Sequence, residues 1–143
     1  MILELMLKLT LTLMILLLLA NVYLLTTKDW IATMAESMAF HFLGGFLAAM
    51  LVFSLYHSEF AKLSQPVRLL TVVAMTLMIG VFWEFSEYIA NQILTNWIYQ
   101  AYHYRGYFMG DLDDTVQDLA MDTIGALTFI ILSFKFANPK IKS

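Results

Sequence analysis

The 143-residue sequence has no cysteine, only two prolines and few charged residues. Without cysteine, the chain can form neither disulfide bonds nor thiolate metal sites. Two prolines and 15% aromatic residues argue against a disordered chain. Charged residues make up 13% of the sequence and the net charge is −3, so the overall basic charge of a nucleic-acid-binding protein is missing. We therefore expect an ordered protein with no nucleic-acid partner.

Apolar residues are what the sequence has in excess. They make up 61% of the chain, and the mean hydropathy is +0.75, well above the values of soluble domains. A helix needs about 20 mainly apolar residues to cross the hydrocarbon core of a bilayer. Four segments meet that length, at about 5–25, 30–56, 67–97 and 115–136. The sequence predicts one domain over residues 1–143, an all-α integral membrane four-helix bundle.

The first apolar segment differs from a cleaved signal peptide. Its start, "MILEL", has no basic residue, its apolar run is too long, and no small-residue cleavage site follows. We expect this helix to be retained.

The basic residues predict an orientation. Four spans place both chain ends and the 57–66 loop on one side of the membrane. Lys28 and Arg105 fall on the opposite side, whereas the first side carries Lys62, Arg68, Lys135, Lys140 and Lys142. The positive-inside rule then places the N- and C-termini in the cytoplasm. We expect a multi-pass inner-membrane protein surrounded by lipid.

Three of the four predicted helices bring ionisable residues together. Counted inward from the outer surface, they reach comparable depths in the outer half of the bilayer. At about 100° per residue, each set also lies on one helical face. The second segment contributes His41, the third Glu84 and Glu87, and the last a stripe of Asp111, Asp114, Asp118 and Asp122. We expect these side chains to converge inside the bundle, where glycines at 44, 45, 80 and 125 allow close helix packing.

The cost of burying these charges separates the interpretations. One ionised carboxylate at the centre of a membrane helix costs about 2.5–3.5 kcal/mol on the insertion scale, so four would cost about 10 kcal/mol or more. That rivals the entire stability of a domain, about 5–15 kcal/mol. Protonation, a water-filled cavity or a bound cation would each relieve it.

Carboxylates with one imidazole are suitable ligands for a divalent metal ion, and Mg²⁺, Mn²⁺, Zn²⁺, Fe²⁺ and Ca²⁺ all stay open. The predicted ligands are His41, Glu84, Glu87, Asp111, Asp114, Asp118 and Asp122. The aspartates near the helix start, at 111, 113 and 114, have a second interpretation, because Asp is also a good helix N-cap.

Two stretches carry a family resemblance. "FWEFSEY" (82–88) followed by "GDLDDTVQDLAMDTIGA" (110–126) resembles the YjdF-type family of small inner-membrane proteins of unknown function. The matching positions are Glu84, Glu87, Gly110, Asp111, Asp114, Asp118, Gly125 and Ala126. The chain also resembles, more distantly, VanZ-like proteins. These resemblances imply a membrane bundle and bring no established reaction.

Three functions fit such a site. A metal-dependent enzyme would act on a lipid or lipid-linked phosphate, with Glu87 or His41 as the base and Arg105 holding the phosphate. A cation or proton transporter would use the acids as its pathway. A structural or accessory protein would use them only to fix helix packing. The sequence names neither the substrate nor the oligomeric state.

Overall fold

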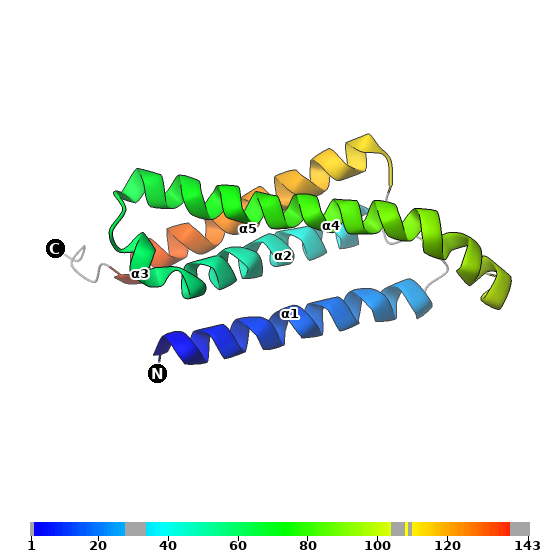
Figure 1. Ribbon diagram of the computed structural model, residues 1–143, viewed down its shortest axis with the longest axis horizontal. Helices are drawn as coiled ribbons and strands as arrows, with labels where there is room; N and C mark the ends of the chain where they lie inside the picture. Colours follow the sequence, from blue (N-terminus) through cyan, green and yellow to red (C-terminus); the bar gives the residue numbers. More distant parts are fainter. Residues whose placement is uncertain (1, 28–33, 104–107, 109, 138–143) are drawn as a thin grey trace.

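The computed structural model describes residues 2–27, 34–103, 108 and 110–137, all of whose regular structure is helical. The chain runs up and down the bundle (Figure 1). Its elements are α1 (Ile2–Thr27), α2 (Met34–Leu55), the short α3 (His57–Phe60), α4 (Gln65–Tyr102) and α5 (Leu112–Ala137). Figure 1 shows that α1 begins and α5 ends at the end of the bundle that carries α3. We refer to this as the α3 end, and to the opposite one as the α5-start end.

Four of these helices are long and apolar enough to cross a membrane, over Leu3–Tyr23, Glu36–Leu55, Gln65–Ala101 and Leu112–Ser133. The prediction of an all-α, four-span membrane protein is confirmed at this level. The boundaries differ in detail. The third helix continues past the expected end at 97, the fourth begins before 115, and α3 lies within the expected 57–66 loop. The side of the membrane on which the termini lie stays a prediction.

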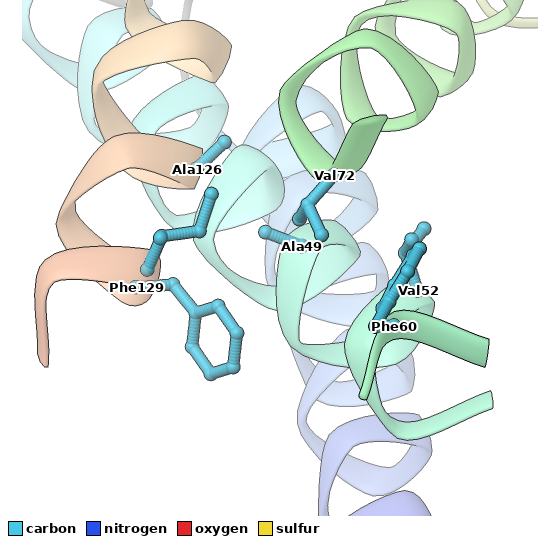
Figure 2. Close-up of a cluster of buried hydrophobic side chains, with 7 residues drawn as sticks. Ala49, Val52, Phe60, Val72, Ala126 and Phe129 are labelled. Atoms are coloured by element: carbon cyan, nitrogen blue, oxygen red, sulfur yellow. The ribbon is translucent and has the colours of Figure 1, made fainter. Parts of the chain in front are cut away.

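The most extensive helix contact joins α2 and α5, which are not neighbours in sequence. A core of apolar side chains packs beside this contact, toward the α3 end. Figure 2 shows this core, with six of its residues labelled. The Phe129 ring meets Phe46 and Phe53 edge-on, with ring centroids 5.5 and 5.8 Å apart. The core consists of Ala49, Val52, Phe60, Val72, Ala126, Phe129 and Ile130.

Two glycines allow the α2–α5 backbones to come this close. A Cβ atom at Gly45 would overlap the Asp122 backbone, and one at Gly125 would overlap the Phe42 carbonyl oxygen. Only residues without a side chain fit there, as is usual where membrane helices touch through small residues. The contact therefore holds Asp122, and the α5 turn around it, directly against α2.

The first helix packs mainly against α2. Among its described side chains only Thr10 is buried, and its hydroxyl donates to the Met6 carbonyl oxygen at 2.7 Å. Most of the large apolar residues elsewhere on α1 are exposed. In a bilayer such a surface faces lipid tails, so exposure carries no penalty there.

The turn before α4 is fixed by polar contacts. Arg68 in the first turn of α4 donates to the carbonyl oxygens of Phe60 and Leu63, at 2.8 and 3.3 Å. At its other end α4 stops at His103, whose φ of 56° is left-handed and whose N–H donates to the Tyr99 carbonyl oxygen. Between these ends α4 runs for 38 residues, and Figure 1 shows it extending beyond the other helices at the α5-start end.

Candidate metal centre

The start of α5 is held by its own aspartates. The Asp111 carboxylate accepts hydrogen bonds from the N–H groups of Asp113 and Asp114, both at 3.1 Å. This is the geometry of a helix N-cap, which satisfies backbone donors that no helical carbonyl can reach. The Asp114 carboxylate in turn accepts from the Gly110 N–H at 3.0 Å. Asp111 and Asp114, both predicted as metal ligands, therefore already accept hydrogen bonds from backbone N–H groups.

One and two turns further along α5, Asp118 and Asp122 are buried, at 2% and 5% exposed. They face His41 of α2: its Nε2 lies 3.3 Å from Asp118 Oδ2, and its Nδ1 lies 3.6 Å from Asp122 Oδ1. Ser37, one turn before His41, donates to the other Asp118 oxygen at 3.0 Å. The imidazole is thus set between two carboxylates.

Gly80 of α4 makes room for the second of these aspartates. A Cβ at position 80 would overlap the Asp122 carboxylate oxygen Oδ2. From Gly80 onward, the inward face of α4 follows the spacing of a helix, with Gly80 and Glu84 buried and Glu87, Asn91 and Thr95 partly buried. This confirms the predicted face and brings the α4 carboxylates toward α2 and α5.

The two α4 carboxylates differ in their partners. Glu87 Oε1 accepts a hydrogen bond from the Trp83 indole at 2.8 Å. Glu84 is 6% exposed; its Oε1 is buried and accepts no well-formed hydrogen bond, although the Thr115 hydroxyl lies close enough to interact with this carboxylate. An unpartnered buried carboxylate oxygen is unfavourable, by about 1–3 kcal/mol or more for a charged group. Its oxygen is available to a ligand.

His41, Glu84 and Glu87 form a group of potential metal ligands. One ligand atom from each lies within 4.8 Å of the others. Oxygen ligands lie about 2.3–2.6 Å from Ca²⁺ and about 2.0–2.1 Å from Mg²⁺, so atoms on opposite sides of an ion are about 4–5 Å apart. The spacing thus fits one ion after small side-chain movements. If one His41 nitrogen binds it, the other still faces an aspartate, an arrangement that commonly orients metal-binding histidines.

The structure brings five of the seven predicted ligands to one place: His41, Glu84, Glu87, Asp118 and Asp122. Asp114 lies at the edge of the cluster, near enough to Glu84 and Asp118 for their charges to interact, and Asp111 caps α5. The predicted phosphate-binding residue, Arg105, lies outside the described residues.

Two contributors were missed by the sequence reasoning. Ser37 lies one helical turn before His41, and its hydrogen bond to Asp118 was not predicted. Trp83 was not considered at all, although it precedes Glu87 by four residues, the spacing at which helical side chains meet. That spacing was the available signal.

The fold and the cluster define a four-helix, multi-pass membrane protein with acidic residues and one histidine between its helices. The chain belongs to the DUF2238 family, described as "Predicted membrane protein (DUF2238)", which it matches over residues 2–138. Comparison with curated proteins and with solved structures gave no match. The resemblance to VanZ-like proteins finds no support in these comparisons.

Proposed function

We propose that this protein binds one divalent cation between α2 and α4, with His41, Glu84 and Glu87 as ligands. The observation that carries the proposal is the spacing of these three groups, whose ligand atoms lie within 4.8 Å of one another. Asp118 and Asp122 lie against the two ring nitrogens of His41, where they orient the imidazole and add negative charge. The predicted roles of Asp111 and Asp114 as ligands receive no support from their capping contacts.

A cation explains the cluster better than a purely structural network. Four carboxylates face one histidine, and within the described part of the chain His41 is the ion-pair partner of both Asp118 and Asp122. A single imidazolium leaves most of that negative charge uncompensated. Glu84 Oε1 also accepts no well-formed hydrogen bond, even with Thr115 nearby, whereas a network that served packing alone would be expected to form one. A divalent ion would balance the negative charge and would bind Glu84 Oε1.

The ligand set is compatible with several metals. Carboxylates favour Mg²⁺, Mn²⁺ or Ca²⁺, and an imidazole shifts the preference toward Mn²⁺, Fe²⁺ or Zn²⁺. The YjdF-type resemblance rests on Glu84, Glu87 and the α5 aspartates, so we propose that those proteins belong to the same family. We place the site in the outer half of the inner membrane, following the distribution of basic residues.

The packing favours a site open to one side over a transport pathway. Toward the α3 end the bundle is filled by the apolar core, in which Val52, Val72 and Ile130 are each at most 3% exposed. An ion crossing the membrane needs polar groups along its whole route. The proposed activity is therefore chemistry on a lipid or lipid-linked phosphate, in which the cation binds phosphate oxygens. Glu87 and His41 are the candidate bases.

Metal content tests the proposal. Protein purified in detergent is loaded with Mn²⁺, Zn²⁺ or Ca²⁺, desalted and measured for bound metal by elemental analysis. We expect close to one ion per chain in the wild type and a large loss in Glu84→Gln. Glutamine keeps the shape of Glu84, so this variant is expected to fold.

Asp113→Asn is the matched control. Asp113 is an exposed acid on α5, and only its backbone N–H is seen in a hydrogen bond, to the Asp111 cap. This variant should keep the wild-type metal content. If the wild type holds no stoichiometric metal and Glu84→Gln and Asp118→Ala unfold like the wild type, the cation proposal is wrong.

A further inference from the structure

A cavity of about 140 Å³ lies between α1, α2 and α4, beside the cluster. Its walls are mostly apolar, and include Leu17 of α1, Ala48 of α2 and Ile79 of α4. Four polar residues also contribute to the lining: Asn21, His41, Thr76 and Asp122. A cavity of similar volume, about 150 Å³, with apolar walls excludes water and accepts a small apolar molecule. The apolar walls therefore favour a hydrocarbon occupant over water.

The cavity has a direction along the bundle. His41 and Ala48 both line it and are seven residues apart on α2, which corresponds to roughly 10 Å along the helix. His41 is nearer the start of α2, at the α5-start end, and Ala48 is nearer the core. The ionisable part of the lining thus lies toward one membrane surface, and the part toward the middle carries no ionisable group. A membrane lipid has the same order, from head group to chain.

The surroundings of the cavity identify the source of the occupant. The first helix packs mainly against α2, and the cavity lies where residues of α1 and α4 face each other across it. Leu18 lines it and is also 47% exposed on the outside of α1. In a bilayer that exposed surface contacts lipid tails, so a chain has direct access from the side.

From these observations we infer that the cavity binds a segment of one acyl chain of a membrane lipid, which enters between α1 and α4 and directs its polar end toward His41 and Asp122. The inference concerns a second ligand and does not require the cation. If both proposals hold, the lipid chain positions its head group beside the metal centre, and the substrate of the proposed reaction is an acyl lipid.

Photo-crosslinking tests the inference. Wild-type protein is reconstituted in vesicles of phosphatidylethanolamine and phosphatidylglycerol, with a trace of phosphatidylethanolamine carrying a diazirine in its acyl chain. After illumination, labelled residues are mapped by peptide mass spectrometry. We expect labelling of Leu17 and Ile79 that saturates at low probe content. Filling the cavity with Ala48→Phe should reduce that labelling several-fold.

Controls separate the cavity from general lipid contact. Ile93, on α4 and 65% exposed, should be labelled without saturation, and Ile93→Phe should leave the cavity labelling unchanged. If Ala48→Phe does not fold, Leu17→Phe narrows the cavity from α1 and gives the same readout at Ile79. Glu84→Gln should lose metal but keep the labelling, which separates the two proposals. A dry or water-filled cavity predicts no saturable label, and that result would overturn the inference.

Discussion

Adjacent glycines on α2 offer the sharpest test of the packing that creates the site. A Cβ added at Gly44 would lie 3.9 Å from Asp122 Oδ1, an ordinary contact, whereas one added at Gly45 would overlap the Asp122 backbone. The same substitution, glycine to alanine, is therefore accommodated at one position and excluded at the next. Comparing the two variants separates the cost of pushing α2 and α5 apart from the gain in helix propensity that both share.

The expected magnitudes follow from the geometry. Alanine gains about 0.5–1 kcal/mol over glycine within a helix, so Gly44→Ala should be neutral or slightly stabilising. Gly45→Ala receives the same gain, but it must push α5 away from α2, and such overpacking costs about 1–3 kcal/mol or more. Because this is the most extensive contact in the bundle, we expect Gly45→Ala to be less stable than Gly44→Ala by about 2 kcal/mol or more.

Reversible unfolding in mixed micelles measures this difference. Each variant is titrated with sodium dodecyl sulfate in dodecyl maltoside, and helix content is followed by circular dichroism. Gly125→Ala, whose Cβ would overlap the Phe42 carbonyl oxygen, should resemble Gly45→Ala. Equal free energies of unfolding for Gly44→Ala and Gly45→Ala would refute the close contact between α2 and α5.

Three further predictions follow from other contacts. Asp111→Ala should lower stability by about 0.5–2 kcal/mol in the same titration, because the helix cap is lost. Asp111→Asn should keep the cap and the wild-type stability. Reduced metal affinity in both variants would instead make Asp111 a ligand. Phe129→Ala should cost about 3–5 kcal/mol as a core truncation, whereas Ile131→Ala, at a position 63% exposed, should change stability little; equal losses would contradict the described core. The chain has no cysteine, so a single introduced cysteine is labelled specifically. With the predicted orientation, Asp113→Cys should react with a membrane-impermeant maleimide in intact cells, and Ser58→Cys only after permeabilisation. The reverse pattern would invert the predicted orientation.

The spans and the faces of the helices could be predicted from the sequence. Four apolar runs are visible without any structure, and a period of about 100° per residue places Asp114, Asp118 and Asp122 on one face. Burial confirms that face, since Asp118 and Asp122 are buried and Asp114 is partly buried. These features depend on the order of apolar and polar residues within a single helix, which the local sequence determines.

Which helices touch could not be predicted. Gly45 and Gly125 were predicted to allow close helix packing, but they are 80 positions apart and nothing in either segment indicates which helix each one meets. The roles of the first aspartates were also ambiguous, because capping and metal binding both use an oxygen near a helix start. The hydrogen bonds of Asp111 decide for the cap. The end of α4 was predicted too early, since no proline or glycine follows Trp97 until position 106.

The position of Glu84 along the long helix α4 determines how far the cluster lies from water. Its 38 residues extend for roughly 57 Å at 1.5 Å per residue, nearly twice the hydrocarbon thickness of about 30 Å. If α4 enters the hydrocarbon near Gln65, Glu84 lies roughly 29 Å along it, close to the opposite surface. An ion arriving from that surface would travel only a turn or two of helix through the protein, and would never meet the middle of the bilayer.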